Sequence, residues 1–295
     1  MSTRSDKLPI VSRLFSSSVV RELARKGRSP AFARLAAQSH LPDTQSNSAL
    51  VRDLFDEAFS MMNTQGLRDE YIYKAALTQK VLLGTHSLQT ASMLTEFRVG
   101  SCKADLAILN GTATVYEVKS DRDSLSRLEK QVEHYLNVFA CVYVIAGDQH
   151  LGNVLDCVPS DVGVLRLNPR FQISTIRYAT DRPERTSSEA IFDCIRTNEA
   201  IMILRSLDIQ VPDVPNTELY AELRNRFRKL ESKLVHDGMV RTLKRTRNLR
   251  KLSALLGDLP RSLHTAALSM RLRKVDHARL VRAVNTRLNN AMAWV

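Results

Sequence analysis

Apolar residues recur every three to four positions over two stretches near the start of the chain, residues 11–39 and 47–63. This spacing places them on one face of a helix, so both stretches are predicted to be amphipathic helices. A further helix is predicted over about residues 65–83. It should end before Gly84, because glycine is the usual residue just past the end of a helix.

The pattern changes after residue 90. Four short segments are rich in β-branched and aromatic residues and are bounded by Gly, Asn, Ser or Asp, as strands are. They are residues 92–99, 104–109, 113–119 and 141–146. A helix over about 123–139, with Asp123 as its N-cap, should join the last two strands. These two strands are therefore predicted to be parallel, with a right-handed crossover.

Two more strands are predicted near residues 162–167 and 172–178, before the chain becomes helical again. The predicted fold is a mixed α/β (α+β) sheet with helices on both faces. It divides the chain into a helical N-terminal region (1–66), an α/β core (67–180) and a helical C-terminal region (181–295).

Charged residues lie on both strands of the predicted hairpin. Asp105 is on the first strand, and Glu117 and Lys119 are on the second, where they share one side because strand side chains alternate. Charges so close to an apolar run cost desolvation energy unless something binds them. Two carboxylates on neighbouring strands form an oxygen site suited to Mg²⁺. The alternative is that Glu117 and Lys119 are an exposed pair on an edge strand.

The hairpin loop decides whether these carboxylates can meet. A two-residue turn would place Asp105 and Glu117 on opposite faces of the sheet. A three-residue loop ending at Gly111 would place them on one face, with Ile108 opposite Thr112. We predict the second arrangement, with a positive φ at Gly111, a conformation that glycine adopts without a Cβ clash.

Asp105, followed after eleven residues by Glu117-Val118-Lys119, resembles the motif of the PD-(D/E)XK nuclease superfamily. The helix that follows adds Gln131 and Tyr135, a QxxxY spacing similar to that of the RecB and lambda-exonuclease branch. The resemblance covers roughly residues 67–180 and extends to a family of uncharacterised bacterial proteins assigned to that superfamily. It implies a restriction-endonuclease-like core.

The resemblance also implies site roles. Asp105 and Glu117 would ligate Mg²⁺ or Mn²⁺, and Lys119 would position or deprotonate the attacking water. Glu96 or Glu70 would complete the acidic set, and we favour Glu96. Gln131 and Tyr135 would join the catalytic residues, although both could equally be ordinary interfacial residues of their helix.

Positive charge is concentrated in the last quarter of the chain. Residues 221–295 carry 18 Lys and Arg against 5 Asp and Glu, whereas the preceding 220 residues carry 25 against 26. Such asymmetry is typical of proteins that bind a polyanion, most often nucleic acid. Sparse aromatic residues favour contact with the phosphate backbone over base stacking. The candidate nucleic-acid-binding residues are Arg241, Lys244, Arg245, Arg247, Arg250 and Lys251. The alternative is a set of solvated helix faces.

Other features narrow the class of protein. The four cysteines lie at least 16 residues apart, which excludes a zinc ribbon or a redox pair and suits reduced thiols. No apolar run is long enough to span a bilayer, and the first residues lack the continuous apolar core of a secretory signal. We therefore expect a cytoplasmic protein, although a transit peptide would share some of this composition. No peptidase, esterase, phosphate-loop or dinucleotide-binding motif is present.

Together these features predict a Mg²⁺-dependent nuclease that hydrolyses DNA rather than RNA, with little sequence readout. The alternatives are a non-catalytic nucleic-acid-binding or regulatory protein on the same fold, and a protein whose basic helices bind an acidic protein partner.

Overall fold

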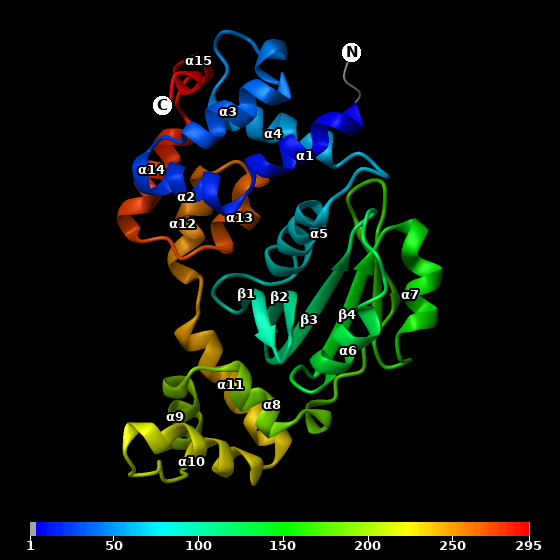
Figure 1. The fold of residues 1–295 in the computed structure, drawn as a ribbon, viewed down its shortest axis with the longest axis vertical. Coiled ribbons are helices and arrows are strands. Elements are labelled where there is room, and N and C mark those ends of the chain that lie inside the picture. Colours follow the sequence, from blue (N-terminus) through cyan, green and yellow to red (C-terminus); the bar gives the residue numbers. More distant parts are fainter. Residues whose placement is uncertain (1–3, 295) are drawn as a thin grey trace.

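The computed structural model describes residues 4–294 and is built around one six-stranded mixed sheet (Figure 1). The strands lie in sequence order and are β1 (Ser92–Val99), β2 (Cys102–Asn110), β3 (Thr112–Lys119), β4 (Cys141–Ala146), β5 (Gly163–Leu167) and β6 (Ile173–Arg177). The pairs β3–β4 and β4–β5 are parallel, and the other neighbouring pairs are antiparallel. All six predicted strands and the parallel crossover are confirmed, and the fold is mixed α/β as predicted.

Helices precede the sheet, connect its strands and follow it. Those before the sheet are α1 (Arg4–Leu14), α2 (Ser17–Lys26), α3 (Pro30–Ser39), α4 (Val51–Met62) and α5 (Glu70–Ala76), which continues as a π-helical turn over Leu77–Leu82. Two helices, α6 (Leu128–Leu136) and α7 (Leu151–Cys157), connect strands of the sheet. After the sheet come α8 (Ser188–Cys194), α9 (Thr197–Ser206), α10 (Asn216–Arg228), α11 (Ser232–Thr246), α12 (Ser253–Asp258), α13 (His264–Leu268), α14 (Lys274–Val284) and α15 (Leu288–Met292). No helix within residues 4–294 is both long enough and apolar enough to cross a bilayer.

Two predicted helices differ from the observed ones. The stretch 11–39 is broken into separate helices, because Gly27 takes a left-handed φ of 73° and Ser29 caps the next helix by accepting a hydrogen bond from the Phe32 N–H. The crossover helix α6 is shorter than predicted. Asp123 accepts a hydrogen bond from the Ser120 N–H at 2.8 Å, so it closes a turn before the helix and is not its N-cap.

The hairpin prediction is half right. Gly111 has the predicted positive φ, 75°, but Asn110 pairs with Thr112 and Leu106 with Tyr116. The predicted pairing of Ile108 with Thr112 is therefore wrong by two residues, because the chain reverses over Gly111 alone.

The sheet separates two hydrophobic cores. One face carries Leu106, Ile108, Tyr116 and Val118, which pack with α1–α5 and α12–α15. The other face carries Ala107, Leu109, Ala113 and Val115, which pack with α6 and α8–α11. The two faces of the sheet therefore belong to different helical layers (Figure 1).

The two ends of the chain meet in the first of these cores. Helix α14 packs against α2, and the Leu288 N–H donates to the Ala49 carbonyl oxygen at 2.8 Å. The region 181–295, predicted as one helical unit, is thus divided. Helices α8–α11 cover one face of the sheet, while α12–α15 join the N-terminal helices, because their apolar stripes pack in different cores.

Candidate metal centre

The site lies where the strand pairing of the sheet is interrupted. Strands β1 and β2 pair on either side of Glu96 and Asp105 but not at these two residues, and the β2–β3 ladder ends at Leu106 and Tyr116. Glu96 takes a φ of +51°, which is uncommon for a residue other than glycine. Such conformations cost of order 1–3 kcal/mol and cluster at functional sites.

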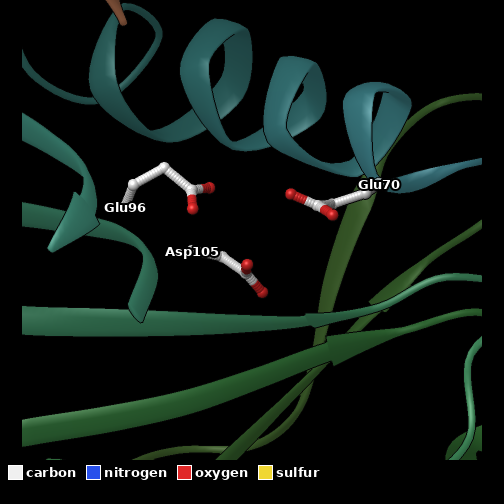
Figure 2. Close-up of side chains that lie close together, drawn as sticks. All are labelled: Glu70, Glu96 and Asp105. Carbon is white, nitrogen blue, oxygen red and sulfur yellow. The ribbon is translucent and has the colours of Figure 1, made fainter. Parts of the chain in front are cut away.

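Three carboxylates converge at this interruption. Glu70 is the first residue of α5, Glu96 lies on β1 and Asp105 lies on β2. One oxygen of each lies within 4.8 Å of the others, and Figure 2 shows the three side chains directed toward a common space. We call these three residues the acidic cluster. The structure brings together both Glu70 and Glu96, which the sequence left as alternatives.

Lys74 lies among these carboxylates. Its Nζ is 2.7 Å from Glu96 Oε1 and 3.7 Å from Asp105 Oδ1, and it also contacts Glu70. Burial disfavours the charged lysine, but Asp105 and Glu70 outweigh burial and raise the pKa of Lys74. Lys74 was not among the residues predicted from the sequence. The available signal was its position four residues after Glu70, which places both on one side of a helix.

A second group of side chains surrounds Glu117. The side chains of Glu117 and Lys119 are only 2% and 7% exposed, and Lys119 Nζ lies 3.0 Å from Glu117 Oε1. Lys119 also donates to Gln131 Oε1 at 2.9 Å, and the Tyr135 hydroxyl donates to Glu117 Oε2 at 2.8 Å. An exposed edge-strand pair is thereby excluded, and the structure places all four predicted residues in one hydrogen-bonded network.

Asp105 stands between the two groups. Its Oδ2 accepts a hydrogen bond from the Val118 N–H at 2.8 Å, which replaces a missing bond of the β2–β3 ladder. Burial and then the negative charge of Glu117 raise the pKa of Asp105 to about 7, and Lys74 offsets only part of this. Burial likewise raises the pKa of Glu117, against the effect of Lys119.

The observed β2–β3 register keeps the parity that the predicted common face for Asp105, Glu117 and Lys119 requires, but the Asp105 side chain also makes a contact on the other side of the sheet. The contacts of Glu117 and Lys119 come from α6, whereas Asp105 meets Lys74 of α5, which packs on the opposite face. Side-chain alternation does not decide the direction of Asp105, because the ladder is interrupted there. The two carboxylates still interact, because Asp105 lies at the gap between the strands.

The donor set fits a divalent metal. Carboxylate oxygens are the ligands that Mg²⁺ and Mn²⁺ prefer. Four carboxylates (Glu70, Glu96, Asp105 and Glu117) and two ammonium groups (Lys74 and Lys119) leave a formal excess of two negative charges when all are ionised. One divalent cation would balance this excess.

The predicted nucleic-acid-binding residues separate into two kinds. Arg241, Lys244, Arg245 and Arg250 line a cleft of about 380 Å³ beside the hairpin turn. Arg247 instead donates two hydrogen bonds, of 2.8 and 2.6 Å, to Glu199 and lies over the Phe97 ring. Its guanidinium is held in the structure by a carboxylate that is 1% exposed. Lys251 is exposed but does not line this cleft.

The fold and this site define a mixed α/β protein with a carboxylate–lysine centre, which is buried at Glu117 and Lys119 and exposed at Glu70 and Glu96, and a separate basic cleft. Residues 63–261, well over half of the chain, match the family of bacteriophage P4 protein cII, so the chain belongs to that family. The matched range includes the acidic cluster, the network around Glu117, and α11.

One curated relative is protein cII of Enterobacteria phage P4, which is 29% identical over 149 residues. The match covers 50% of this chain and 49% of the relative, so the chain spans about half the length of that protein. Among solved structures, the SPO1766 protein of unknown function from Silicibacter pomeroyi is similar over 41% of this chain and 82% of its own, with 18% identity and a TM-score of 0.28.

Proposed function

We propose that this protein is a Mg²⁺-dependent nuclease that hydrolyses phosphodiester bonds. The observation that supports this most is the buried network in which Gln131 and Tyr135 hold the Glu117–Lys119 pair beside Asp105. The arrangement also resembles the PD-(D/E)XK motif, for which a carboxylate pair and a lysine carry the chemistry.

Each residue of the network has a role in this proposal. Asp105 and Glu117 would hold the metal, which when bound lowers the pKa of a coordinated water and neutralises charge on the phosphate. Lys119 is held by Glu117 and Gln131 and would orient the attacking water. Tyr135 fixes the position of Glu117 through its 2.8 Å hydrogen bond.

The acidic cluster extends this site. Glu70 and Glu96 would supply further oxygen ligands once the Lys74 ammonium moves aside, because both now contact it. The basic cleft beside the hairpin turn would bind the phosphate backbone of the substrate, which we propose to be DNA rather than RNA. Gly111 lies six residues from Asp105 along the hairpin, so this cleft is roughly 20 Å from the metal centre.

A second candidate function is non-catalytic nucleic-acid binding or regulation. One observation favours it: the Lys74 ammonium pairs with all three carboxylates of the acidic cluster and so neutralises part of their charge. We also propose that the protein acts in the cytoplasm, where its four free cysteines would stay reduced.

Cleavage of plasmid DNA and of single-stranded DNA by the purified chain, with Mg²⁺ or Mn²⁺, separates these candidates. Glu117→Gln should reduce cleavage at least 100-fold while leaving the fold and DNA affinity unchanged, since the amide is nearly isosteric. Glu129→Gln, at an exposed acidic residue of the same helix that holds Tyr135, is the matched control and should cleave normally. Equal rates for wild type and Glu117→Gln would contradict the nuclease assignment.

A further inference from the structure

A large cleft opens over the acidic cluster. It measures about 800 Å³, and Glu70, Lys74 and Glu96 form part of its lining. The facing walls come from α1, α2 and α13, and from the loop that follows β3. The N-terminal helices, which the sequence analysis left without a function, therefore border the candidate metal centre.

Three arginines line this cleft. Arg13 is in the last turn of α1, Arg21 is on α2, and Arg122 is in the loop between β3 and α6. All three are exposed, and none forms an ion pair or a side-chain hydrogen bond with any residue whose side chain the structure describes. By contrast Arg224, Arg228 and Arg273, outside this cleft, are paired with carboxylates.

Guanidinium groups without a carboxylate partner, placed beside an acidic cluster, can hold an anionic ligand that the carboxylates would otherwise repel. The carboxylates of the cluster repel a phosphodiester, so a substrate needs separate positive groups to hold its backbone near the metal. Arginine suits this role because its planar, permanently charged group bonds phosphate oxygens in pairs. Among the described residues that line the cleft, the aromatic ones are Phe15 and Tyr71. They stack on each other with a centroid distance of 4.6 Å and offer no free platform for bases.

We propose that this cleft holds one nucleic-acid strand by its phosphates, with Arg13 and Arg21 on one wall and Arg122 on the other. The choice of substrate rests on the proposed function. The occupant is a single strand because the cleft, at about 800 Å³, is far smaller than one turn of a duplex, which is ~34 Å long and wider than its own major groove of about 12 Å. The N-terminal helices are then part of the substrate-binding site and do not serve only to cover the sheet.

The test is a binding measurement in the presence of a chelator, so that no strand is cut. The probes are a labelled single-stranded oligonucleotide and the duplex of the same sequence. Arg13→Gln/Arg21→Gln is compared with Arg28→Gln/Arg34→Gln, a control pair in the same helical region. The control arginines are exposed, form no ion pair with a described side chain, and lie outside the cleft.

The cleft pair should weaken single-strand binding about tenfold and reduce the slope of log affinity against log salt by about 1.4, or ~0.7 for each lost contact. The control pair should change affinity less than twofold, and duplex binding should change less than single-strand binding. Equal effects of the two pairs, an unchanged slope, or an equal loss for both probes would each overturn the proposal. Because cleavage is not measured, loss of binding would support this site even if the chain proved to have no nuclease activity.

Discussion

The two lysines of the candidate metal centre are held in different ways. Lys119 has one carboxylate and one neutral amide as partners, and its carboxylate is in turn fixed by Tyr135. Lys74 is surrounded by three carboxylates. The carboxylate that holds Lys119 is only 2% exposed, whereas Glu70 and Glu96, which hold Lys74, are 53% and 55% exposed, so a cation from solvent can reach them and replace Lys74. We therefore propose that Lys119 takes part in the chemistry and that Lys74 neutralises the acidic cluster until the metal binds.

The largest expected difference separates these two lysines in a cleavage assay. Lys119→Met should lower kcat at least 100-fold, because the group that orients the water is lost. Lys74→Met should lower kcat less than fivefold and should tighten Mg²⁺ binding, because it removes a competing cation. Isothermal titration with Mg²⁺ and steady-state cleavage rates measure both effects. Equal losses of activity for the two variants would contradict the division of roles.

The Asp105 carboxylate should lower the stability of the metal-free protein but should be needed for metal binding. Asp105→Asn should raise the free energy of unfolding of the metal-free protein by about 1–3 kcal/mol at pH 8, since it removes a buried negative charge. Mg²⁺ should raise the melting temperature of the wild type but not of this variant. Thermal unfolding with and without Mg²⁺ measures both effects, and stabilisation of Asp105→Asn by Mg²⁺ would count against Asp105 as a ligand.

The pH dependence has a definite sign. The folded-state pKa of Asp105 is raised to about 7, so the folded protein keeps a proton that the unfolded chain has lost between about pH 4 and 7. Stability of the metal-free protein should therefore fall as pH rises through this window and become level above it. Metal-dependent activity should show the opposite trend, because a protonated Asp105 cannot ligate. Unfolding and cleavage measured from pH 5 to 8 test both trends. The stability trend should be smaller in Asp105→Asn, where only the raised pKa of Glu117 still contributes.

A smaller effect is expected at Tyr135. Tyr135→Phe removes the hydroxyl that donates to Glu117 Oε2 and also lies 2.9 Å from the Lys103 carbonyl oxygen. Only the bond to Glu117 bears on the chemistry, so kcat should fall about 3–10-fold, in line with the loss of ~1 kcal/mol for one hydrogen bond. Because phenylalanine keeps the aromatic ring of tyrosine, the packing of α6 on the sheet should not change. A loss as large as that of Glu117→Gln would show that Tyr135 has a direct chemical role.

The smallest expected effect concerns the basic cleft beside the hairpin turn. Arg241→Gln/Arg245→Gln should weaken duplex DNA binding modestly and reduce its salt slope by up to about 0.9 per lost contact. Fluorescence anisotropy at several salt concentrations measures the slope. An unchanged slope would mean that these side chains are ordinary solvated surface.

Local sequence patterns predicted the strands of the sheet, but they did not predict which charged side chains pair with each other. The strands were predictable because β-branched runs and bounding Gly or Asn residues are local signals, and the network from Glu117 to Tyr135 follows from spacing on one strand and one helix. Lys74 was missed because its role depends on strands β1 and β2, more than twenty residues away. Arg247 was assigned to nucleic acid from charge density, which carries no information about its partner Glu199, 48 residues earlier.

A divalent cation should bind between Asp105 and Glu117. Crystals of the full chain grown with Mn²⁺ would show this directly through the anomalous scattering of the metal. We expect a Mn²⁺ ion ligated by Asp105 and Glu117, with the Lys74 Nζ displaced from Glu70 and Glu96. A structure at saturating Mn²⁺ with no ion at these carboxylates, and with Lys74 still bound to the acidic cluster, would contradict it.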